Sequence, residues 1–183
     1  MKTEEIAYLA GFFDGEGTIS IVHRKEISGW NGKKYNNWRL KIGVGNHCGK
    51  PLFKFEKLLG GSVSKGKSKT CCKYYWSADG NIAASALIAL LPCLSVKKKQ
   101  ALVAIKFQQR IKSTPKAKAG LSKRERWMRN EMRLEIRRLN ARYSLAAKNR
   151  LIKEGVSCEY IDNQKPWDEN SRIGRRDESP SCN

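Results

Sequence analysis

The sequence predicts an α+β fold of the order αββαββα, with a four-stranded antiparallel sheet and a C-terminal helical extension. One pair of segments alternates between apolar and polar residues, which is typical of hairpin strands that bury one face, and a second pair later in the chain also indicates a hairpin. Short amphipathic segments with helical spacing of their apolar residues flank and separate these pairs. Because the helices should cover one face of the sheet, we expect the other face to stay open.

The N-terminal third contains the first helix and the first hairpin. Residues 4–13 predict an apolar helix with Thr3 as its N-cap, and residues 14–17 (Asp-Gly-Glu-Gly) should end it, with glycines supplying unusual backbone angles. From Thr18 the period changes to two, and the return strand covers about 37–44. The residues expected to face the core are Ile19, Ile21, Leu40, Ile42 and Val44.

The rest of the chain repeats this pattern and then becomes helical. The expected elements are a helix at 50–59, a hairpin from 62–67 and 72–78, and helices at 80–91 and 97–111. We therefore divide the chain into a core at 1–112 and an extension at 113–183, which holds a helix at about 121–154 and a polar tail. Its basic stripe would face DNA or solvent, and consists of Arg126, Arg129, Arg133, Arg137 and Arg138.

The charge of the chain indicates its partner. Lysine and arginine number 37 against 17 acidic residues, a net charge of +20, which favours a nucleic acid as ligand. No apolar run is long enough to span a membrane, and the first 20 residues lack the pattern of a secretory signal. We therefore expect a protein that is not secreted and has no membrane partner.

The motif that indicates chemistry lies at residues 9–17, which read Leu-Ala-Gly-Phe-Phe-Asp-Gly-Glu-Gly. It resembles the signature of the LAGLIDADG homing endonucleases. Further segments resemble that family in the same order, so that the likeness covers about residues 4–110; they are 41–46, 76–78, 91–94 and 97–101. Since the chain has one copy of the motif, the resemblance implies a homodimer that cuts a long, near-palindromic double-stranded DNA site.

The resemblance also implies roles for individual residues. Glu16 stands where the family has its metal-binding carboxylate, and the Gly15 carbonyl could join it in binding Mg²⁺ or another divalent ion such as Mn²⁺. Asn46 would orient water near the metal, and Lys97 and Lys50 would lie near the scissile phosphate. The first helix would form the dimer interface through its thin side and its C-terminal end, with Ala7, Ala10, Gly11 and Asp14. Asp14 would also cap or brace the helix ends.

DNA would contact the polar face of the sheet. On the first hairpin the residues in phase are Ser20, Val22, Arg24, Arg39 and Lys41, and on the second hairpin Lys65, Lys67, Lys73 and Tyr75 would continue the face. Arginine can pair with guanine through two hydrogen bonds, and lysine more often contacts phosphate.

Three readings of the function remain after these steps. The leading one is a site-specific endonuclease encoded by a mobile intron, in a chloroplast, a mitochondrion or a bacterial cytoplasm. The alternatives are an intron maturase that binds intron RNA on the same fold, and a DNA-binding protein without catalysis. An intact Glu16 favours cleavage. Residues 61–68 also match the pattern of a P-loop, but a predicted helix precedes them and a strand follows, so we reject nucleotide binding.

Overall fold

A computed structural model of the chain describes residues 3–27, 32, 34–67, 72–114, 121–141, 149 and 152–153. The elements are α1 (Thr3–Glu16), β1 (Gly17–Ile27), β2 (Lys34–Asn46), α2 (Gly49–Leu59), β3 (Ser62–Lys67), β4 (Cys72–Asp79), α3 (Gly80–Leu90), a 3₁₀ turn at Leu91–Cys93, α4 (Lys98–Ser113) and α5 (Lys123–Ala141). The predicted α+β order is therefore confirmed, and within the extension a helix is present.

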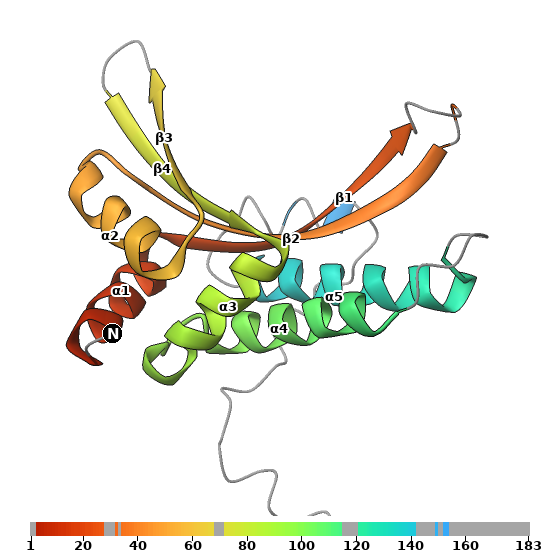
Figure 1. The fold of residues 1–183 in the computed structure, drawn as a ribbon. Helices are drawn as coiled ribbons and strands as arrows, with labels where there is room; N and C mark the ends of the chain where they lie inside the picture. Colours follow the sequence, from red (N-terminus) through yellow and green to blue (C-terminus); the bar gives the residue numbers. More distant parts are fainter. Residues whose placement is uncertain are drawn as a thin grey trace, which may run out of the picture.

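The four strands form one curved antiparallel sheet. Their order is β1-β2-β4-β3, so the two hairpins meet through β2 and β4. In Figure 1 the described helices lie on one side of the sheet, and the concave side faces away from them. This arrangement leaves the concave face available to a ligand.

The core lies between the sheet and the helices. Every strand residue predicted to face it is at most 5% exposed, because alternate side chains of β1 and β2 point to the same side. Trp76 of β4 fills the centre, packs on Phe55 of α2 and donates a hydrogen bond from Nε1 to the Gly60 carbonyl. No helix among the described residues is long and apolar enough to cross a membrane.

The junction between α1 and β1 differs from the prediction. The helix continues through Asp14 and Gly15 to Glu16, and neither Gly15 nor Gly17 has a positive φ angle. What Gly17 provides is space, because a Cβ there would collide with the carbonyl oxygen and the ring of Phe13. Glu16 is therefore the last residue of a helix that passes directly into a strand.

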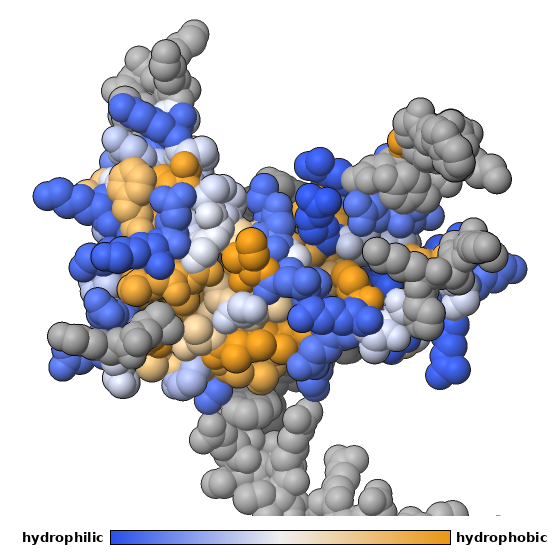
Figure 2. Space-filling view, in the orientation of Figure 1, coloured by the Kyte–Doolittle hydropathy of each residue, from blue (hydrophilic) through white to orange (hydrophobic). Residues whose placement is uncertain are grey.

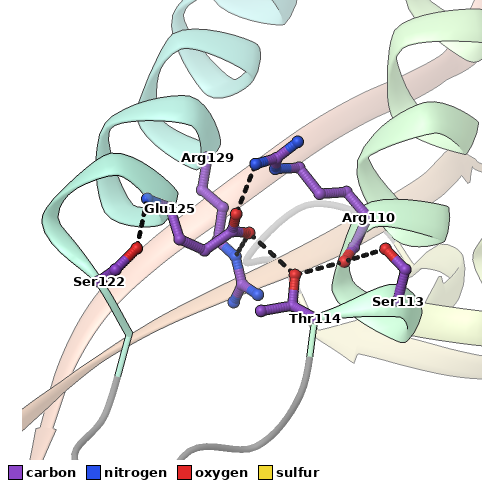
Figure 3. Close-up of polar contacts among 6 residues, drawn as sticks. All are labelled: Arg110, Ser113, Thr114, Ser122, Glu125 and Arg129. Carbon is purple, nitrogen blue, oxygen red and sulfur yellow. Dashed lines mark hydrogen bonds and ion pairs between the residues drawn. The ribbon is translucent and has the colours of Figure 1, made fainter.

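Helix α5 packs against α4 and β1, on the helical side of the sheet. Arg129 had been expected on a solvated or DNA-facing stripe, but it is 8% exposed and its Nε donates to Glu125 Oε1 at 2.8 Å. Arg110 of α4 donates to the other oxygen, Oε2, at 2.6 Å (Figure 3). An ion triad thus fastens α5 to the core, and the predicted part of the helix beyond residue 141 lies largely outside the described residues.

Candidate metal site and nucleic-acid interface

Glu16 lies at the junction of α1 and β1. Its side chain is exposed, while Phe13 one turn earlier is fully buried, so the helix is fixed and its last carboxylate is free to meet a ligand. Gly17 pairs with Val44, which places Glu16 beside the end of β2. Gly15 is also exposed.

Lys97 and Asp14 are next to Glu16. Lys97 is half-buried just before α4, and its Nζ donates a hydrogen bond to the Asp14 carbonyl oxygen. Burial lowers the pKa of Lys97, and the negative charges of Asp14 and Glu16 offset part of that shift. Three candidate residues that are up to 83 positions apart therefore form one cluster.

Asn46 and Lys50 lie where β2 ends and α2 begins. The Asn46 side-chain oxygen accepts a hydrogen bond at 2.8 Å from the backbone N–H of Cys48, the N-cap residue of α2. This contact fixes the orientation of the Asn46 amide group. Lys50 is in the first turn of α2 and is exposed.

A single chain offers few ligands for a metal. Among the described residues no group of three or more His, Cys, Asp or Glu side chains could hold an ion. The oxygen donors at the α1 end are the Glu16 carboxylate and the Gly15 carbonyl. Mg²⁺ is commonly held by one or two carboxylates together with waters and substrate phosphates. These donors therefore suit a divalent ion in kind, but the described part of one chain does not supply a full set of ligands.

The concave face of the first hairpin is polar and basic, as expected. Ser20 pairs with Lys41 and Val22 with Arg39, on the face opposite the buried residues of the same strands. A hollow on this face is lined by Val22, Arg24, Asn37, Arg39, Lys41 and Asp79. Asp79 lies 4.0 Å from Arg39, an exposed ion pair that contributes little to stability. The expected face thus exists here, with one acidic residue that was not expected.

On the second hairpin, the residues that were expected on this concave face lie on two different sides of the sheet. Lys73 and Tyr75 lie on the concave side, and the Tyr75 ring is 3.1 Å from where a Cβ would stand at both Gly45 and Gly66. Lys65 instead pairs with Tyr74, with its Nζ 5.7 Å from that ring. Because Tyr74 packs on Phe53 of α2, Lys65 lies on the helical side, contrary to the expected register. The Lys67 side chain is outside the described part.

The outer side of α1 is thin, but its small residues differ in part from those expected. Ala7 and Gly11 are exposed, and a Cβ at Gly11 or Gly15 would have no atom within 4 Å. Ala10 is fully buried in the core of its own chain, so it does not belong to this side. The small side is therefore Ala7, Gly11 and Gly15, at intervals of four residues.

Comparisons with known proteins place the chain in a family. Residues 9–109 match a family profile described as LAGLIDADG endonuclease, while no curated protein sequence matches. One similar structure is the homing endonuclease I-CvuI in complex with the I-CreI target, with a TM-score of 0.59 and 19% identity over 74% of this chain and 82% of that chain. The archaeal intron-encoded I-Vdi141I complexed with DNA gives 0.58 and 15% identity over 74% and 84%. The endonuclease I-GzeII in complex with its DNA target gives 0.53 and 17% over 93% and 54%.

Proposed function

This chain belongs to the LAGLIDADG endonuclease family, and we propose that it is a site-specific endonuclease that cuts double-stranded DNA as a homodimer. The proposal includes an origin in a mobile intron, which a match between the cut site and the insertion site of the intron would test. The DNA complexes of the similar proteins support a DNA substrate.

The observation that carries the proposal is the position of Glu16. An exposed carboxylate at the end of a helix that is anchored in the core by one face, beside a half-buried lysine, can bind a cation and meet a phosphate at the same place. One chain supplies only one such carboxylate at this point. A second copy related by a two-fold axis would bring a second Glu16 to it.

The outer side of α1 supports such a dimer. Small residues let two helices approach closely, and Ala7, Gly11 and Gly15 form a continuous small stripe that ends next to Glu16. Exposed apolar side chains are also found on α1 and on α3, which contacts α1; they include Tyr8 and Ile88, both about half exposed. Figure 2 shows hydrophobic side chains gathered in the region where α1 and α3 lie. Contiguous exposed apolar patches often mark protein–protein interfaces.

Within this proposal each group of residues has its own role. A bound divalent ion would polarise a phosphoryl oxygen and activate water. Glu16 and the Gly15 carbonyl would hold the ion, while Asn46 would orient water and Lys97 would face the phosphate. The concave faces of two copies would follow the DNA, with Arg24, Arg39, Lys41, Lys73 and Tyr75 in contact with it.

The experiment that tests the function uses the purified chain and a library of DNA duplexes. After addition of Mg²⁺ the cut ends are captured and sequenced, with EDTA and Glu16→Gln in parallel. We expect cuts at one near-palindromic site, lost in both controls, while Glu16→Gln still binds that site because the basic face is unchanged. Equal cutting by Glu16→Gln would defeat the site assignment. Binding without cutting by the wild type would favour a non-catalytic DNA-binding protein, and intron RNA would then be tested as ligand.

A further inference from the structure

The Asp14 carboxylate joins the end of α1 to the start of α4. Its Oδ2 accepts hydrogen bonds from the backbone N–H groups of Ser95, at 2.7 Å, and Val96, at 3.1 Å. Its Oδ1 accepts the N–H of Lys97 at 2.9 Å. The first N–H groups at a helix start have no partner within the helix, and Lys97, the N-cap of α4, makes no side-chain cap of its own. Asp14 therefore binds the N-cap N–H of α4 and the two N–H groups just before it, from a distant part of the chain.

The same residue also holds the Lys97 side chain. The Lys97 ammonium group donates to the Asp14 carbonyl oxygen, so both ends of this lysine are bound to Asp14. A lysine side chain loses much rotamer freedom when it is fixed. Here the Lys97 side chain is ordered within the folded chain, by Asp14, which is two residues before Glu16.

We propose that Asp14 is a positioning residue, which fixes Lys97 beside Glu16 so that its ammonium group is in place before DNA binds. This inference rests on the proposed nuclease function. A charged group that is already oriented need not be ordered during the reaction, and this lowers the barrier. Of the two acids in the Asp14-Gly15-Glu16 segment, one would thus organise the site and the other would bind the ion.

The test compares Asp14→Asn, Lys97→Met and the double variant with the wild type. Asparagine keeps the size of the side chain, but one of its oxygens becomes an NH₂ group that cannot accept the backbone N–H bonds. We expect the single-turnover cleavage rate of Asp14→Asn to fall by about 100-fold, the loss that a misplacement of 1 Å can cause. The DNA affinity and the Mg²⁺ concentration for half-maximal rate should not change. In the Lys97→Met background the substitution should have no further effect.

Three outcomes would overturn the inference. They are an unchanged rate in Asp14→Asn, an equal loss of rate in the Lys97→Met background, and a rate that excess Mg²⁺ restores, which would make Asp14 an ion-binding residue. Glu135→Gln, which removes a charge from an exposed position on α5, is the matched control and should behave as the wild type. If Asp14→Asn does not fold, Asp14→Glu, which keeps the charge but displaces it, takes its place with the same expectation.

A second readout separates this inference from the function itself. If the wild type cuts no DNA, the proposed function fails, and the order of the Lys97 side chain is then decisive. Nitrogen relaxation of the Lys97 ammonium group by NMR should show a rigid group in the wild type and a mobile one in Asp14→Asn. An equally mobile Lys97 in both proteins would overturn the inference without reference to catalysis.

Discussion

Replacing Glu125 by glutamine should weaken the attachment of α5 to the core. Glu125 is 7% exposed, and its two oxygens accept hydrogen bonds from Arg129 and Arg110. Glutamine keeps the volume but leaves Arg129, 8% exposed, without its counter-charge. Removing one partner of a buried pair costs about 3–5 kcal/mol. We expect the lower end, about 3 kcal/mol, because the Arg110 side chain is 34% exposed and solvent screens its charge.

Calorimetry and hydrogen exchange measure this effect. A loss of about 3 kcal/mol lowers the melting temperature of a chain of this size by roughly 6–12 °C. Amides of α5 should exchange faster, while those of β4 and α2 should change less. Glu135→Gln, on an exposed position of the same helix, is the control and should stay within about 0.5 kcal/mol. A loss below about 1 kcal/mol, or equal exchange changes throughout the protein, would refute the reasoning.

The pH dependence of the melting temperature shows whether the charge of Glu125 stabilises the fold. Burial tends to raise the pKa of Glu125, but the hydrogen bonds from Arg129 and Arg110 outweigh it, so the pKa is lowered. A lowered folded-state pKa stabilises the fold above the ordinary value of about 4.3, and this contribution is lost as the pH falls through the folded-state value. The difference in melting temperature between wild type and Glu125→Gln should therefore be constant from about pH 7 to 5 and shrink below about 4.3.

Two glycines of α1 and its junction give further predictions. Gly11→Lys should abolish dimer formation on DNA and in sedimentation without lowering the stability of the monomer, because a side chain at Gly11 enters open space in the single chain. Gln109→Lys, at an exposed position on α4, is the charge-matched control. A Gly11→Lys protein that still dimerises would exclude this face of α1 as the interface. Gly17→Ala should cost about 1–3 kcal/mol in urea unfolding, because its Cβ meets Phe13. Gly15→Ala, in open space within a helix, should instead be neutral or stabilising, and the same loss at both positions would contradict this explanation.

The order of elements could be predicted because alternation and helical spacing are local signals. Ile19 and Ile21 opposite Leu40 and Ile42 specify both the hairpin and its buried face. The face predicted for Lys65 of β3 was wrong because the segment 62–67 contains one apolar residue, Val63. In the structure Val63 pairs with Trp76 of β4. With so weak a pattern, only the partner strand determines which face Lys65 takes.

The extension shows where charge patterns are insufficient. Arg129 belongs to a row of arginines that resembles a solvated face, but it pairs with Glu125, which also pairs with Arg110 of another helix. One local signal was present, because Glu125 and Arg129 are four residues apart on the same helix, the spacing of a paired glutamate and arginine. That signal indicates a pair, but it does not indicate that the pair is buried.

The candidate site shows the same limit at the level of chemistry. The motif places Asp14 and Glu16 two residues apart, and only the resemblance to the family assigned the metal ion to Glu16 and the bracing of the helix ends to Asp14. The structure separates them by their hydrogen bonds, since both oxygens of Asp14 are taken by backbone N–H groups of residues 95–97, whereas the Glu16 side chain is exposed. Three of the roughly four acceptor sites of the Asp14 carboxylate are used by these N–H groups, which leaves it less able to coordinate an ion than an exposed carboxylate. The proposed division of roles between the two acids therefore rests on hydrogen bonds to a segment more than 80 residues away, which the residues of the motif alone do not reveal.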